Sequence, residues 1–75
     1  MDTNVFKIAP YTKRELAKLY FPNTKNIDSA VANLRNLIKR NPELREELYN
    51  TGYHPYSKLF TPRQVRIIIG ILGEP

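Results

Sequence analysis

Apolar residues recur at helical spacing in four separate stretches of the chain. In each stretch the apolar side chains stand three and four positions apart, which places them on one face of an α-helix. The stretches cover residues 12–20, 28–40, 42–51 and 62–72. The pattern predicts an all-α fold of four short helices with polar loops between them.

The predicted helices begin at residues that favour helix N-termini. In Thr12–Glu15 and Thr61–Gln64 a threonine stands three positions before a glutamate or glutamine, which is the spacing of a capping box. Asp28 and Ser29 are alternative caps for the second helix. Asn41, followed by a proline, ends that helix and caps the third.

Two segments lack a helical period. Phe6 and Ile8 alternate with Lys7, which indicates a very short edge strand. Residues 53–60 combine aromatic and basic side chains with a proline. Two structures stay open for this second segment: a tight, minimal β-hairpin or an ordered loop.

The inward-facing positions of the four helices define the predicted core. It consists of Leu16, Leu19, Val31, Leu34, Ile38, Leu44, Leu48, Val65, Ile68, Ile69 and Leu72. Ile67 and Ile71 widen the apolar stripe of the last helix beyond one face. This helix is therefore either the central core helix or the contact surface of a homodimer.

Length and composition limit what the chain can contain. Its 75 residues predict one domain, 1–75, with residues 1–5 as a flexible tail. Without cysteine the chain cannot form a disulfide or a thiolate metal site. No apolar run approaches the ~18 residues of a membrane span, and the N-terminus lacks the order of a signal peptide. We therefore expect no membrane partner and a cytoplasmic location.

The chain lacks the usual marks of a catalytic or metal site. His54 is the only histidine, and Glu43, Glu46 and Glu47 stand where carboxylates interact favourably with a helix N-terminus. A phosphate-binding glycine loop, a nucleophile elbow and a zinc-binding helix motif are all missing from the sequence. We expect no enzymatic activity, no catalytic residues, no cofactor and no metal.

Charge points to a binding role instead. Twelve Lys or Arg against seven Asp or Glu give a net charge of +5. Such a charge attracts polyanions at long range. The alternative also stays open, because small domains carry net charges of about this size without any partner.

The second predicted helix carries a polar surface opposite its apolar stripe. Asn33, Asn36 and Arg40 follow i, i+3, i+7 spacing, and Arg35 and Lys39 form an i, i+4 pair. Asparagine and arginine read adenine and guanine edges in a major groove, and cations neutralise phosphates. The competing interpretation is an ordinary solvated face, although two cations four positions apart slightly oppose the helix.

Cations outside this helix extend the candidate site. Lys13 and Arg14 belong to the first helix, Lys58 lies between aromatic residues, and Arg63 begins the last helix. We expect these four side chains to hold phosphates. Two arrangements stay open: one continuous basic face or cations scattered over the surface.

Six short motifs are spread over the chain. They are Phe6–Ile8, Glu15–Ala17, Leu19–Pro22, Ser29–Ala30, Phe60–Val65 and Leu72–Pro75. In these motifs the chain resembles a family of small Bacteroidetes proteins known only as a domain of unknown function. The resemblance covers roughly residues 5–75 and implies no particular activity.

Two segments carry a looser similarity. Residues 11–17 are similar to the first helix of winged helix-turn-helix proteins of the excisionase and MerR-like kind, and residues 58–65 to their wing strand and following helix. This similarity implies a helix-turn-helix-like fold in which residues 28–40 form the recognition helix and 53–60 a β-hairpin wing. The chain departs from that pattern in its long first loop and in the extra helix at 42–51.

The sequence therefore predicts a small non-enzymatic domain that binds double-stranded DNA, in a regulatory role. The alternative is a protein–protein interaction module. That module would use apolar and aromatic side chains of the last helix and the preceding loop: Ile67, Ile71, Tyr53, Tyr56 and Phe60. A shared basic face favours the first function, and an exposed apolar patch of several hundred Å² favours the second.

Overall fold

The four helices of the structure follow the four periodic stretches of the sequence. The computed structural model describes residues 6–54 and 56–75, so the tail expected at 1–5 lies outside the described residues. The elements in chain order are β1 (Tyr11–Thr12), α1 (Lys13–Tyr20), α2 (Ile27–Arg40), α3 (Pro42–Asn50), β2 (Leu59–Phe60) and α4 (Pro62–Leu72). The prediction of four short helices is confirmed, and a small two-stranded sheet accompanies them.

Hydrogen bonds at the helix starts explain most of the boundaries. Both predicted capping boxes are present, one from Thr12 at α1 and one from Thr61 at α4. The cap predicted for α2 was wrong, because the side chain of Asn26 accepts a hydrogen bond from the Asp28 amide at 2.8 Å. The helix starts earlier than expected because Ile27, its first residue, packs against the core.

The sheet joins two segments that are far apart in the sequence. β1 pairs with β2 in antiparallel register, with Tyr11 opposite Phe60 and Thr12 opposite Leu59. One further backbone bond continues the pairing, since the Lys13 amide donates to the Lys58 carbonyl at 2.9 Å. The start of α1 is thereby tied to the segment that leads into α4.

The strand predicted at residues 6–8 was wrong. These residues fold back onto Tyr11, whose hydroxyl donates to the Lys7 carbonyl at 2.8 Å. The ring of Phe6 also stacks on that of Tyr11, with centroids 5.4 Å apart. Side-chain contacts, and not strand pairing, therefore hold this segment against Tyr11.

A hairpin within residues 53–60 is also not formed. In the described part of this segment the only strand is β2, and it pairs with β1. The ring of Tyr53 stacks on that of Phe60 at 5.8 Å between centroids, with the planes nearly parallel. An ordered loop was the second structure left open for this segment, and the stack of two rings holds it against the core.

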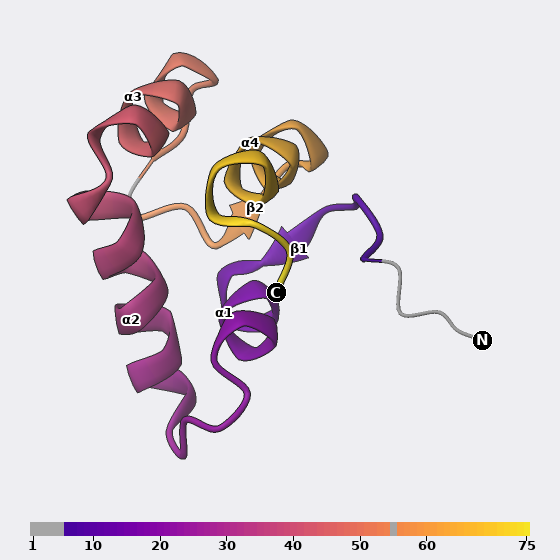
Figure 1. Ribbon diagram of the computed structural model, residues 1–75, viewed down its shortest axis with the longest axis vertical. Coiled ribbons are helices and arrows are strands. Elements are labelled where there is room, and N and C mark those ends of the chain that lie inside the picture. The colour runs from indigo at the N-terminus through magenta and orange to yellow at the C-terminus, as the bar shows by residue number, and fades with distance from the viewer. Residues whose placement is uncertain (1–5, 55) are drawn as a thin grey trace.

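The helices surround one small core. In Figure 1, α1 lies beside the longer α2, and α4 lies above the small sheet, with α3 at the upper end of α2. Packing between α1 and α2, between α2 and α3, and between α3 and α4 closes the structure. The hydroxyl of Tyr20 at the end of α1 also donates to the Gly73 carbonyl just after α4.

Most of the predicted core is buried. The buried apolar side chains are Leu16, Ala17, Ala30, Leu34, Ile38, Leu44, Leu48, Phe60, Val65 and Ile68. Val31, Ile69 and Leu72 are partly buried against them, as are Ile67 and Ile71, which favours α4 as the central core helix.

Two core assignments differ from the prediction. Leu19 is 44% exposed, because burial of Leu16 and Ala17 turns the inner face of α1 away from it. Phe60 was expected in a surface contact but is fully buried, since strand pairing directs its side chain inward. No helix in the described part of the chain is long and apolar enough to cross a membrane.

Candidate nucleic-acid interface

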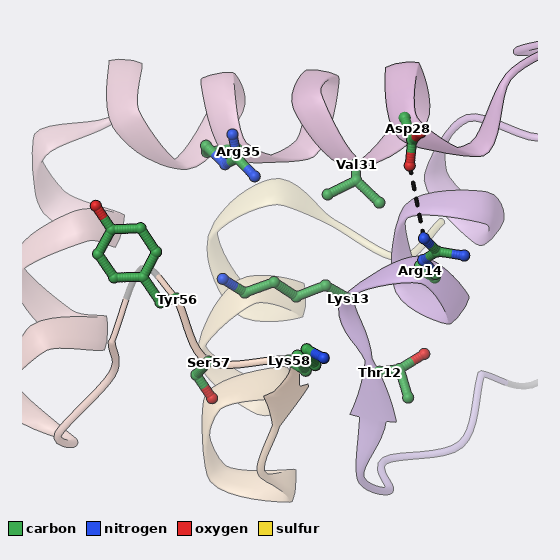
Figure 2. A pocket seen from close by; sticks show the side chains of 9 residues that line it. All are labelled: Thr12, Lys13, Arg14, Asp28, Val31, Arg35, Tyr56, Ser57 and Lys58. Carbon is green, nitrogen blue, oxygen red and sulfur yellow. Dashed lines mark ion pairs between the residues drawn. The ribbon is translucent and has the colours of Figure 1, made fainter.

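A hollow of about 490 Å³ opens between the start of α1, one side of α2 and the segment before β2. We call it the basic hollow, because four of its lining side chains are cations. Its lining residues are Thr12, Lys13, Arg14, Asp28, Val31, Arg35, Tyr56, Ser57 and Lys58. Figure 2 shows that these side chains come from the end of β1 and the start of α1, from the segment before β2, and from α2, which runs along the upper edge.

The small sheet brings two of these cations, Lys13 and Lys58, together. Lys13 follows β1 and Lys58 precedes β2, so the antiparallel register places them at the same end of the sheet. The backbone hydrogen bond between Lys13 and Lys58 keeps the two residues adjacent in any side-chain rotamer. Two lysines distant in sequence therefore line one site.

Lys13 crosses the middle of the basic hollow (Figure 2). Its ammonium lies 5.0 Å from the ring centroid of Tyr53 and 5.9 Å from that of Phe60, within the range of cation–π attraction. Burial lowers the pKa of Lys13 below its ordinary value, and the positive charge of Arg35 lowers it further. Arg35 therefore acts on Lys13 across the hollow as a like charge.

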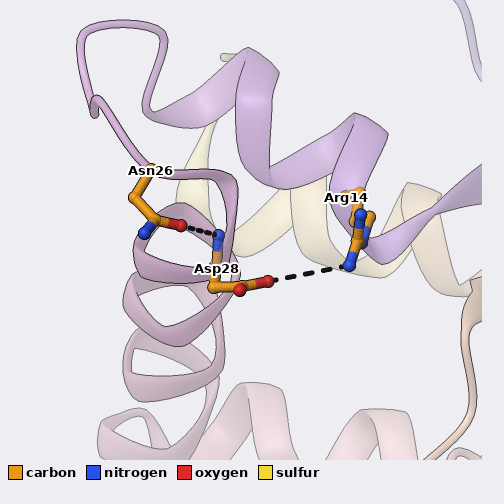
Figure 3. Close-up of polar contacts among 3 residues, drawn as sticks. All are labelled: Arg14, Asn26 and Asp28. Carbon is orange, nitrogen blue, oxygen red and sulfur yellow. Dashed lines mark hydrogen bonds and ion pairs between the residues drawn. The ribbon is translucent and has the colours of Figure 1, made fainter.

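Arg14 lies at the edge of the basic hollow away from Tyr56, where an ion pair holds it (Figure 2). Its guanidinium lies 3.7 Å from the carboxylate of Asp28, and both side chains are largely exposed. Figure 3 shows that Asp28 is itself positioned by the cap of α2, in which Asn26 accepts from its amide. An exposed pair of this kind is worth little in water, about 0–1 kcal/mol, so an anion can compete for Arg14.

The helix dipole adds to the positive potential of the basic hollow. Lys13 and Arg14 occupy the first turn of α1, where the aligned peptide groups already carry partial positive charge. The carboxylate of Glu15 in the same turn is occupied by the capping box, where it accepts from the Thr12 amide at 2.9 Å. Cations at this end disfavour the helix slightly, so stability does not explain their position.

A second, shallower hollow of about 240 Å³ lies on the other side of α2. We call it the amide hollow, because two asparagines line it. It is formed by Phe21, Asn33, Asn36, Leu37 and Arg40. The i, i+3, i+7 set of the sequence is therefore gathered here, while Arg35 of the i, i+4 pair lines the basic hollow.

The remaining predicted site residues line neither hollow. Lys39 is exposed on the outward face of α2, and its carbonyl accepts from the Arg45 guanidinium at 3.2 Å. Arg63 is exposed in the first turn of α4. The structure thus brings Lys13, Arg14, Arg35 and Lys58 together and leaves Arg63 separate.

Sequence reasoning did not assign Asp28, Thr12 or Ser57 to the site, because each reaches it only through the packing of α1, α2 and the sheet. Tyr56 was assigned to the alternative apolar contact, and it is 87% exposed at the wall of the basic hollow. Its position two residues before Lys58 was the one signal available in the sequence.

The apolar contact that was predicted for the alternative function is not fully exposed. Phe60 is buried in the core, and Ile67, Ile71 and Tyr53 are partly buried against it. A different apolar hollow lies beside the exposed Leu19 on α1. Of the predicted set, Phe60 is therefore covered, whereas Tyr56 is exposed.

Comparison with known proteins gives one result. Residues 7–75 match the family described as Domain of unknown function (DUF4248). The chain belongs to this family. The resemblance to a domain of unknown function is thereby confirmed. No curated protein and no solved structure matches the chain.

A fold, or membership of a family of unknown function, assigns no activity to this DUF4248 domain, so its function depends on the chemistry of the site. Within the described residues, no group of three histidine or acidic side chains is placed to hold a metal. The basic hollow combines four cations with one carboxylate that is already paired. Its chemistry suits an anion with several oxygens, such as a phosphate.

Proposed function

We propose that this domain binds double-stranded DNA and carries out no chemistry on it. The observation that supports the proposal best is the meeting of Lys13, Arg14, Arg35 and Lys58 around one hollow. Phosphate contacts supply most of the affinity of DNA-binding proteins, and they require cations that lie within reach of one strand. Four cations from three segments of the chain meet that requirement.

In this proposal α2 faces the major groove. Its outward side chains are exposed along 14 residues, about 21 Å of helix. Figure 1 shows α2 at the edge of the molecule, with α1 on its inner side. Asn33 and Asn36 read base edges, while Lys39 and Arg40 neutralise phosphates beside them.

The similarity to winged helix-turn-helix proteins gives further support. The two segments that carry it, residues 11–17 and 58–65, include the two paired strands and are therefore spatial neighbours. In place of a hairpin wing, residues 56–58 follow the DNA backbone next to α2. Arg63 holds a phosphate farther along the duplex, and the proposed site of action is the cytoplasm.

A salt-dependent titration with labelled duplex DNA tests the proposal. The expected result is binding at low salt with a linear fall of log K against log salt, by about 0.9 for each neutralised phosphate. Absence of duplex binding at low salt would overturn the proposal, since the net charge of +5 is then least screened. Binding that vanishes at physiological salt and shows no sequence preference indicates generic polyanion attraction, and the protein-interaction function then takes precedence.

A matched pair of variants separates the site from net charge. Arg35→Gln with Lys58→Gln removes two charges from the basic hollow, and Lys18→Gln with Arg66→Gln removes two exposed charges elsewhere. The proposal requires the first pair to weaken binding more than the second. Equal losses would attribute the binding to overall charge alone.

A further inference from the structure

The wall of the basic hollow carries an aromatic side chain that the core does not use. Tyr56 is 87% exposed, and its ring meets that of His54 at 5.6 Å between centroids, tilted by 47°. It does not belong to the hydrophobic cluster formed by the other loop aromatics, Tyr53 and Phe60. Packing therefore gives no reason for a large aromatic ring at this position.

The neighbourhood of Tyr56 is cationic. Figure 2 shows its ring at one end of the hollow, with the Lys13 side chain pointing toward it, and Arg35 and Lys58 line the same hollow. An aromatic ring beside cations is the arrangement with which proteins bind single-stranded nucleic acids, since bases stack on the ring and phosphates lie among the cations. Duplex-binding surfaces need the cations but not the ring.

The size of the basic hollow limits what can occupy it. About 490 Å³ falls in the range of small-ligand pockets and suits one nucleotide. The faces of a base inside a duplex are covered by its neighbours, so an internal base cannot stack on Tyr56 while it stays paired. The ring and the cations therefore select an unpaired nucleotide.

We propose that the basic hollow holds one unpaired nucleotide, with its phosphate among Lys13, Arg35 and Lys58 and its base on the ring of Tyr56. The proposal rests on the proposed binding of nucleic acid and names the part of the ligand that this site takes. In a bound duplex, that nucleotide comes from a single-stranded extension or an opened base pair.

Small probes test the site without any duplex. Adenosine 5′-monophosphate, inorganic phosphate and adenosine are titrated separately into the isotope-labelled protein, and amide shifts of residues 56–58 are followed. We expect the nucleotide to bind more tightly than phosphate or adenosine alone. Tyr56→Leu should lower the affinity for the nucleotide to that for phosphate, whereas Tyr56→Phe should keep the stacking and the affinity. A nucleotide that binds no more tightly than phosphate overturns the proposal.

Nucleic-acid probes separate this proposal from duplex binding. A blunt duplex is compared with the same duplex carrying a short single-stranded extension. The extension should raise affinity by about 5- to 150-fold, the range for stacking one base, and Tyr56→Leu should abolish this gain. Leu19→Ala, which shortens an exposed apolar side chain of α1 outside the hollow, should leave the gain intact.

The outcomes are distinct. If the blunt duplex binds and the extension adds nothing, the unpaired-nucleotide site is refuted and the duplex function stands. If the extension and the mononucleotide bind while the blunt duplex does not, the site stands and the duplex function fails.

Discussion

The basic hollow and the amide hollow lie on opposite sides of α2, and their residues come together in different ways. The amide hollow takes Asn33, Asn36 and Arg40 from one helix, with Phe21 as the contribution of another segment. The basic hollow takes its cations from the start of α1, from α2 and from the segment before β2. One site is largely local in sequence, and the other depends on long-range packing.

This difference has a consequence for binding. Side chains that share a helix face keep their spacing as long as the helix is intact. Cations from separate segments remain close only while the whole domain is folded, and their repulsion has to be balanced by packing. The basic hollow is therefore the more sensitive of the two sites to loss of stability, and its charge is concentrated.

Loss of the core under α2 should have the largest effect and remove both hollows together. Leu34 is 2% exposed, and Leu34→Ala should cost roughly 2–5 kcal/mol, close to the stability of a domain this small. A urea denaturation curve measures the change. Leu37→Ala, at a side chain 37% exposed in the amide hollow, is the control and should cost less. An unchanged midpoint for Leu34→Ala would show that α2 does not depend on this contact.

Removing two cations from the basic hollow or from the last turn of α2 comes next in size. Arg35→Gln with Lys58→Gln acts on the basic hollow, and Lys39→Gln with Arg40→Gln acts on the last turn of α2, where Arg40 lines the amide hollow. If DNA contacts both groups of cations, each pair should lower the salt slope by about two and reduce affinity at ~0.1 M salt by one to two orders of magnitude. A slope that changes for one pair alone identifies the group of cations that DNA contacts.

The amide hollow should decide which sequence is bound, with a smaller effect. Asn36→Ala should reduce discrimination between the preferred and a changed site by about 1–3 kcal/mol, because it removes a bidentate contact to a base. Competition titrations with single-base-pair variants measure this difference. Arg35→Gln in the basic hollow should weaken all sequences alike. A uniform loss for Asn36→Ala as well would place both hollows on the phosphate backbone.

The smallest expected effect is a pH dependence confined to the basic hollow. The pKa of Lys13 is lowered from its ordinary value of 10.5, by burial first and by Arg35 second. As the pH rises toward this lowered pKa, Lys13 loses its charge, so affinity for phosphate should fall earlier than for an ordinary lysine. The amide hollow has Arg40 as its cation, which stays charged.

Lys13→Arg is the matching variant, since a guanidinium keeps its charge over the same range. Phosphate titrations at about pH 8.5 and about pH 9.5, where the phosphate is a dianion throughout, should show a fall in affinity for the parent chain and a much smaller one for the variant. The same fall in both proteins would mean that another group causes it.

Prediction from the sequence succeeded where the relevant contacts are a few positions apart. The capping boxes at Thr12 and Thr61 and the break at Asn41 located the helices to within one residue. The prediction that Leu19 is buried was wrong, because a helix of two turns has several possible inner faces. The residues that decide which face is buried are distant in sequence. Phe60 failed for a similar reason, because its burial depends on pairing with Tyr11.

The sequence by itself determined the four helices, the family, and the split of the α2 surface into an i, i+3, i+7 set and an i, i+4 pair. The helices and the split follow from periodicity along one element, which acts over a few residues, whereas the family follows from the motifs spread along the chain. Only the tertiary structure decided that Lys58 and Lys13 are neighbours and that Tyr56 lines the same hollow as Lys13 and Arg35. The physical reason is that a two-residue strand has no periodic signal of its own, so its partner is chosen by the packing of the whole chain.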